Sequence, residues 1–76
     1  MIKAVKTIVV AEDKSSAALS ILIEEEIPFS IAKMEIGSLL GEMNCYCITI
    51  ICASALKWRA IKKNLINIEG VLAYTK

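Results

Sequence analysis

The sequence predicts an α+β fold in which two helices cover one face of a four-stranded antiparallel sheet. Runs rich in β-branched residues alternate with helical patterns in the order strand, helix, strand, strand, helix, strand. The 76 residues have room for one domain, residues 1–76. Two right-handed crossovers and one hairpin then give strand order 4-1-3-2.

The first half of the chain is expected to form a strand and a helix. The segment IKAVKTIVVA is β-branched and continuously apolar in its second half, which predicts a strand over Ile2–Ala11. The oxygens of Asp13, Ser15 and Ser16 can cap the helix that follows. Good helix formers continue until Pro28 blocks the helix, so we expect it over about 14–26.

The second half is expected to form a hairpin, a helix and a last strand. The segment FSIAKMEI and the segment Met43–Cys52 pair through a turn built from Gly37, Ser38 and Gly41. Ser54 can cap a second helix. That helix has apolar residues on one face, namely Trp58, Ile61, Leu65 and Ile68. Gly70 is expected to end it in a left-handed cap before the strand VLAYT.

The three cysteines lie in the predicted third strand. Alternation places Tyr46, Ile48, Ile50 and Cys52 against the helices, and leaves Cys45, Cys47, Thr49 and Ile51 on the open sheet face. Three cysteines without a histidine cannot complete a four-ligand zinc site in one chain. Two chains could pool Cys45 and Cys47 and, with Met34 or Met43, bind Cu(I). The simpler interpretation is that the cysteines are small apolar residues with no metal or other cofactor.

Composition and charge narrow the classes of function. The chain has no histidine to act as a general base and no glycine-rich phosphate loop, so we expect no enzyme and no catalytic residue. Its net charge of +1 and the lack of an aromatic platform on the first strand argue against nucleic-acid binding. No apolar run reaches the length of a membrane span, and a cytoplasmic location is expected. The 57% content of hydrophobic residues is high, so part of the apolar surface is expected to face a partner.

Charges are segregated on the two predicted helices. The first ends in the acidic run 24–26, which is expected to lie near Lys57 and Arg59 at the start of the second. The basic residues of the second helix and the terminal strand offer a candidate contact set for a partner protein. This set is Arg59, Lys62, Lys63 and Tyr74.

The predicted topology is that of the ferredoxin-like sandwich, and three segments resemble the ACT-like regulatory domains. They are KTIVVAED, EEEIPFSIAKMEI and the closing LINIEGVLAYT, which together cover most of the chain. The resemblance implies a regulatory role and amino-acid binding at the loop after the first strand. The candidate ligand loop is Glu12, Asp13, Ser15 and Ser16.

Three functions therefore stay open. The first is a small non-catalytic regulatory or adaptor protein that acts through protein contacts as a homodimer, by an edge strand or the open sheet face. The second is an ACT-type amino-acid sensor. The third is a small inhibitor or modulator of a larger protein, of the kind that phages and mobile elements encode.

Overall fold

The computed structural model describes residues 3–38 and 41–75 and has the predicted order of elements. Strand β1 (Ala4–Ala11) leads through a short 3-10 helix, η1 (Glu12–Lys14), into helix α1 (Ser15–Glu24). Strands β2 (Phe29–Ser38) and β3 (Gly41–Cys52) follow, and then helix α2 (Ala55–Ile66) and strand β4 (Val71–Tyr74). No helix of the described residues is long and apolar enough to cross a membrane.

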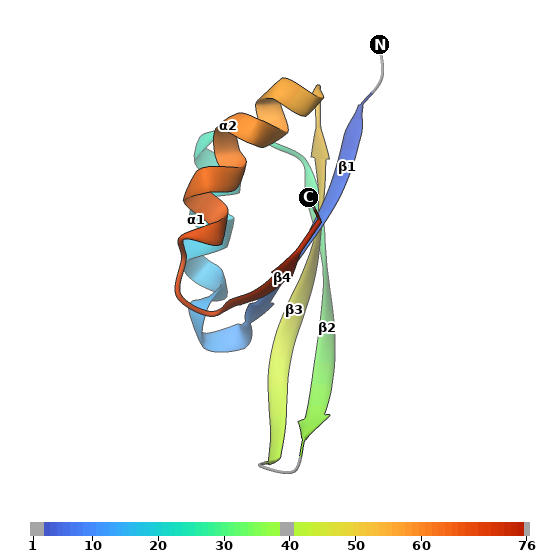
Figure 1. The fold of residues 1–76 in the computed structure, drawn as a ribbon, viewed down its shortest axis with the longest axis vertical. Coiled ribbons are helices and arrows are strands. Elements are labelled where there is room, and N and C mark those ends of the chain that lie inside the picture. Colours follow the sequence, from blue (N-terminus) through green and yellow to red (C-terminus); the bar gives the residue numbers. More distant parts are fainter. Residues whose placement is uncertain (1–2, 39–40, 76) are drawn as a thin grey trace.

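The four strands form one antiparallel sheet in the order β2-β3-β1-β4. This is the predicted order 4-1-3-2 read from the other edge, so the predicted strand order is confirmed. Both helices lie on the same side of the sheet, and no helix of the described residues covers the other side (Figure 1). The β2–β3 hairpin extends beyond the helices as an arm (Figure 1), and the molecule measures 44 × 20 × 18 Å.

The core lies between the helices and the sheet. It contains Ile8 and Val10 from β1, Ile48 and Ile50 from β3, and side chains of both helices, among them Leu22 and Leu65. The predicted inward face of β3 is confirmed, because Ile48, Ile50 and Cys52 are buried and Tyr46 packs against this cluster.

Helix α1 is shorter than the predicted 14–26 and has no side-chain cap at its start. Ser15 donates its hydroxyl proton to the Glu12 carbonyl oxygen (2.8 Å) instead of accepting from a helix amide. At the other end Glu26 takes a left-handed conformation (φ 55°), and the Ile27 amide donates to the Leu22 carbonyl oxygen. The helix thus ends before Pro28 because the chain turns to bring Ile27 into the core.

The other boundaries differ from the prediction in smaller ways. The first strand begins at Ala4, and Ile2 lies outside the described residues. Gly37 and Ser38 are paired strand residues, opposite Glu42 and Gly41, so they lengthen the arm instead of forming its turn. Residues 39–40, between the two strands, lie outside the described residues.

Helix α2 has the predicted cap and the predicted buried face. The Ser54 hydroxyl oxygen accepts from the Lys57 amide (3.2 Å), and Trp58, Ile61 and Leu65 are buried. The helix ends at Ile66, before Ile68, although Ile68 still packs against the core. Gly70 has a positive φ of 98° as predicted, but it serves the turn into β4 rather than the cap of the helix.

Candidate functional site

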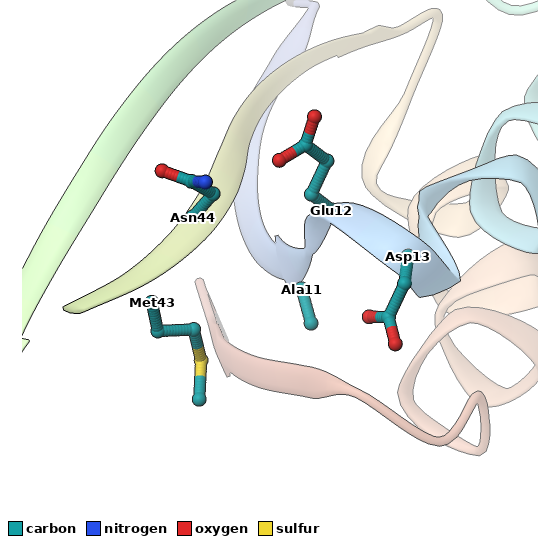
Figure 2. A pocket seen from close by; sticks show the side chains of 5 residues that line it. All are labelled: Ala11, Glu12, Asp13, Met43 and Asn44. Carbon is teal, nitrogen blue, oxygen red and sulfur yellow. The ribbon is translucent and has the colours of Figure 1, made fainter. Parts of the chain in front are cut away.

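A pocket of about 580 Å³ lies where β1 ends and η1 begins. Its lining comes from two strands and the 3-10 helix, and Figure 2 shows these five side chains: Ala11, Glu12, Asp13, Met43 and Asn44. The chain brings them together because β3 pairs with β1 up to Ala11 and Cys45, and β3 then continues into the arm while β1 turns away. The pocket therefore has an apolar wall and two carboxylates.

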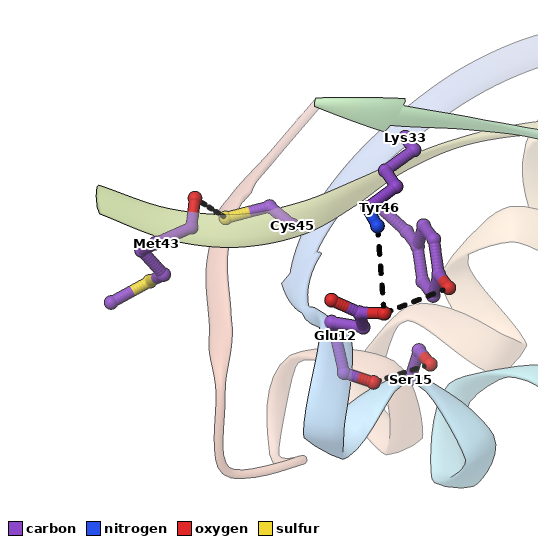
Figure 3. A network of polar contacts seen from close by, with 6 residues as sticks. All are labelled: Glu12, Ser15, Lys33, Met43, Cys45 and Tyr46. Carbon is purple, nitrogen blue, oxygen red and sulfur yellow. Dashed lines mark hydrogen bonds and ion pairs between the residues drawn. The ribbon is translucent and has the colours of Figure 1, made fainter. Parts of the chain in front are cut away.

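The Glu12 carboxylate is engaged by two side chains of the sheet. Its Oε1 atom lies 3.9 Å from the Lys33 ammonium and accepts from the Tyr46 hydroxyl at 3.4 Å (Figure 3). Both contacts are long, and the Lys33 and Glu12 side chains are 57% and 40% exposed. A screened pair of this kind contributes little free energy of folding, so Lys33 and Glu12 can change partners at small cost.

The predicted ligand loop is only partly assembled at this pocket. Glu12 and Asp13 line it, as expected for a ligand site after the first strand. Ser15 is buried with its hydroxyl on the Glu12 carbonyl oxygen, and Ser16 is exposed and uses its carbonyl oxygen to accept from Ser20. The two serines are therefore not among the lining residues. Two carboxylates favour an amine or another cationic group over an anion in this place.

Ala11, Met43 and Asn44 are the lining residues that the sequence did not indicate as part of a ligand site. The register of β1 and β3 is the signal that could have found them. Ala11 lies opposite Cys45, so the residues that follow Ala11 and those that precede Cys45 meet at the pocket. The sequence gives the order of the strands but not this register.

The uncovered side of the sheet, here called the open face, has no charged side chain among its described strand residues. The register places these residues on it: Val5, Thr7, Val9 and Ala11 of β1, Ser30, Ala32 and Met34 of β2, Met43, Cys45, Cys47, Thr49 and Ile51 of β3, and Ala73 of β4. Val5 is 61% exposed and Met43 47% exposed. An uncharged face across all four strands is unusual for a surface that meets only water.

The predicted open-face cysteines differ in accessibility. Cys47 is half-buried and Ile51 is exposed, as expected for residues without a helix over them. Cys45 lies on the same side by register, but its side chain is completely buried. Its short side chain stands between the neighbouring positions of Ala11 and Met34, and its thiol lies 4.0 Å from the Met43 carbonyl oxygen (Figure 3). Cys45 is therefore not available as an accessible contact residue.

The arm has the opposite polarity on its two sides. Toward the helix side it carries Lys33, Glu35, Glu42 and Asn44, although no helix reaches that far (Figure 1). Toward the open face it carries Ala32, Met34 and Met43. If water covered both sides of the arm, polar residues would be expected on both. The arm is thus apolar toward the open face and charged toward the helix side.

The three thiols are free and no described group of three or more His, Cys, Asp or Glu side chains could hold a metal ion. A Cu(I) site pooled from Cys45 and Cys47 of two chains stays an untested alternative. Burial raises the pKa of the Cys52 thiol above its ordinary value, and the nearby Lys57 and Lys6 oppose this shift. Cys52 is thus a protonated core side chain at neutral pH.

The acidic end of α1 meets the start of α2, as predicted. The Lys57 ammonium lies 2.7 Å from a Glu25 carboxylate oxygen. Of the candidate partner-binding set, Arg59 and Lys63 are exposed on α2, Lys62 is half-buried and Tyr74 is exposed on β4. Tyr74 lies opposite Ile8, which places it on the helix side of the sheet. The described structure records no hydrogen bond or ion pair that joins Tyr74 to the basic residues.

The fold and these surfaces define a small α+β protein with one uncovered sheet face, on which the described strand residues carry no charge. Comparisons with models of known protein families, with curated proteins and with solved structures find no match to this chain.

Proposed function

We propose that this chain is a small non-catalytic regulatory or adaptor protein of the ferredoxin-like, ACT-like type, which acts through protein–protein contacts as a homodimer. The open face is the surface that a protein partner covers, and the partner presents an apolar, uncharged surface to it. The observation that carries the proposal is the polarity of the arm, which is apolar toward the open face and charged on the other side.

The size of the open face supports a protein as the partner. Four strands about 4.8 Å apart and about eight residues long at 3.3 Å per residue span roughly 500 Å² in projection. Side-chain relief raises the accessible area toward the roughly 800 Å² that each partner buries in a standard protein interface. A small ligand would cover only part of such a surface.

The substitution Thr49→Lys tests the role of the open face. Thr49 stands in the middle of the face, between Thr7 and Ser30 on the neighbouring strands. A lysine there puts a charge where the partner must approach, so we expect loss of the proteins that immobilised wild-type chain captures from its native host. The matched control is Glu42→Lys, which adds a lysine on the charged side of the arm and should leave capture unchanged.

The oligomeric state completes the test. We expect a dimer in sedimentation velocity at tens of micromolar for wild type, Thr49→Lys and Glu42→Lys. A wild-type chain that stays monomeric at millimolar concentration would refute the homodimer. Identical capture by wild type and Thr49→Lys would refute the open face as the contact surface, and a monomeric Thr49→Lys would show that this face joins the two copies.

An amino-acid sensor is the second candidate, and the pocket at Glu12 and Asp13 is the observation that favours it. The two carboxylates suit the ammonium group of an amino acid or a diamine. We expect any such ligand to raise the melting temperature of wild type but not of Asp13→Asn in a thermal-shift screen of amino acids and amines. No stabilisation by any member of the screen would eliminate this function.

A further inference from the structure

The outer edge of β2 is the longer of the two edges of the sheet. β2 has ten residues, Phe29–Ser38, whereas β4 at the other edge has four. Strand β2 is a margin of the sheet because only β3 pairs with it, and its second half belongs to the arm that extends beyond the helices (Figure 1). A long edge strand without proline presents a row of backbone donors and acceptors, and such a row readily pairs with another strand.

The register fixes which residues of β2 use their backbone groups at this edge. The Ile51 amide donates to the Pro28 carbonyl oxygen (3.0 Å), and residues 28 and 51 continue the register in which Phe29 lies opposite Ile50. Even-numbered positions of β2 therefore direct their N–H and C=O groups to β3. Odd-numbered positions direct them outward, and these are Phe29, Ile31, Lys33, Glu35 and Gly37.

We propose that two copies of this chain join by antiparallel pairing of their β2 edges, with Met34 of both copies on the twofold axis. Lys33 then lies opposite Glu35 of the partner subunit, and Glu35 lies opposite Lys33 of the partner subunit. The backbone N–H and C=O groups of Lys33 and Glu35 both point away from β3. Each Lys33–Glu35 pair therefore occupies a hydrogen-bonded position of the new ladder. The partner is a second copy because its edge carries the complementary charges in the complementary order.

Neighbouring registers fit less well. An axis at Lys33 places Lys33 opposite Lys33 of the partner subunit, and an axis at Glu35 places two glutamates opposite each other. Like charges directly opposite destabilise a sheet, whereas opposite charges stabilise it. A shift by one residue would pair outward-facing with inward-facing backbone groups and lose the ladder.

Two further features agree with the axis at Met34. Ile31, which is 44% exposed, lies opposite Gly37 of the partner subunit, where an added Cβ would meet nothing within 4 Å. The two Met34 side chains, each 37% exposed, lie next to each other on the open face. The pairing therefore covers exposed apolar side chains in addition to the backbone edge.

The Lys33 side chain can exchange its present partner, Glu12, for Glu35 of the partner subunit. Its ammonium lies 3.9 Å from Glu12, and that pair is about half exposed on both sides, so turning toward Glu35 of the partner subunit loses little. The inference rests on the homodimer of the proposed function and adds its interface and register. It leaves the open faces of both copies on the same side of one eight-stranded sheet, where a protein partner can cover them together.

A pair of charge variants tests the register. The variant Glu35→Lys has lysine at both positions, and the variant Lys33→Glu has glutamate at both. Each variant alone should dimerise at least about tenfold more weakly than wild type, because two attractive pairs become repulsive. An equimolar mixture should form a heterodimer with at least wild-type affinity, since every lysine then faces a glutamate. Sedimentation velocity with one variant fluorescently labelled measures all three species.

The matched control is Glu42→Lys, which makes the same charge change as Glu35→Lys on the same side of the arm but on β3, away from the edge. It should dimerise like wild type. A second variant, Ile31→Pro, removes an outward N–H without removing a bond to β3, and it should weaken the dimer while circular dichroism stays native. If Lys33→Glu fails to fold because the new glutamate lies near Glu12, Ile31→Pro still tests the β2 interface.

The outcomes separate this inference from the proposed function. A wild-type monomer overturns both. A wild-type dimer that Glu35→Lys, Lys33→Glu and Ile31→Pro all leave unchanged overturns only the β2 interface and keeps the homodimer. Weakening by each charge variant without recovery in the mixture would overturn the Lys33–Glu35 register.

Discussion

Substitution of Gly70 tests how tightly the turn into β4 packs against Lys14, which precedes helix α1. Gly70 lies in the turn into β4 at φ 98°, and its carbonyl oxygen accepts from the Ala11 amide (2.9 Å). A Cβ at this position would lie 2.7 Å from Cγ and 2.8 Å from Cβ of Lys14. These are atoms at the base of the lysine side chain, so rotating the end of that side chain does not relieve the contact.

The expected cost of Gly70→Ala follows from two terms. A left-handed backbone costs an L residue about 1–2 kcal/mol, and a core-like overlap adds about 1 kcal/mol or more. The lower entropy of the unfolded chain returns about 0.4–1 kcal/mol. We therefore expect Gly70→Ala to lower the free energy of unfolding by about 2 kcal/mol, a large part of the stability of a small domain.

The other two glycines separate these terms. Gly41 also has a positive φ, 123°, but an added Cβ meets nothing within 4 Å, so Gly41→Ala should cost about 1 kcal/mol. Gly37 has neither feature, and Gly37→Ala should be neutral or slightly stabilising. Urea unfolding followed by circular dichroism measures all three. If Gly70→Ala costs no more than Gly41→Ala, the contact with Lys14 has no energetic weight and the reasoning is wrong.

Three further predictions concern the thiols, the second helix and the basic surface. Because burial raises the pKa of Cys52, the folded state holds a proton that the unfolded state loses, so stability should fall as the pH rises above about 9.0 and should fall less steeply in Cys52→Ala. Ser54→Ala should lower the free energy of unfolding by about 1 kcal/mol because the helix loses its cap. Lys57→Met removes an exposed ion pair and should lower this free energy by less than about 1 kcal/mol, and not at all in high salt. Urea titration measures both variants. Charge reversal at Arg59 and Lys63 should leave the melting temperature nearly unchanged and abolish capture of a partner that uses this surface; an equal loss of stability would assign these residues a role within the fold.

The strand order and the inward face of β3 could be predicted because each rests on one strong pattern. The order of elements admits few right-handed, unknotted topologies. In β3 the residues Ile48 and Ile50 alternate with smaller ones, which sets the buried face. The α2 face was equally predictable from the helical spacing of Trp58, Ile61 and Leu65.

The end of α1 and the burial of Cys45 could not be predicted because both depend on contacts between distant segments. Pro28 sets only the latest end of the helix, and the left-handed Glu26 ends it earlier so that Ile27 can enter the core. Cys45 is on the expected side of its strand, yet its neighbours on β1 and β2 decide its exposure. Met43 and Asn44 reach the pocket only through the register of β3 against β1, which is likewise set by contacts between distant segments.

The two proposed interfaces fit together because they use different groups of the same strands. Pairing at the β2 edge uses outward N–H and C=O groups, while the open face uses side chains such as Met34 and Cys47 that point out of the sheet. Joining two sheets of four strands at about 4.8 Å per strand doubles the width of the apolar face from about 19 to about 38 Å. The pocket's Asn44 lies opposite Glu35, one strand in from the paired edge, so the pocket stands at the level of the axis and each copy lines its own pocket with residues of β1, η1 and β3. A dimer built in this way presents one broad apolar platform and two acidic pockets. The mixture of Glu35→Lys and Lys33→Glu would restore that platform, whereas each variant alone would form it at least about tenfold more weakly than wild type.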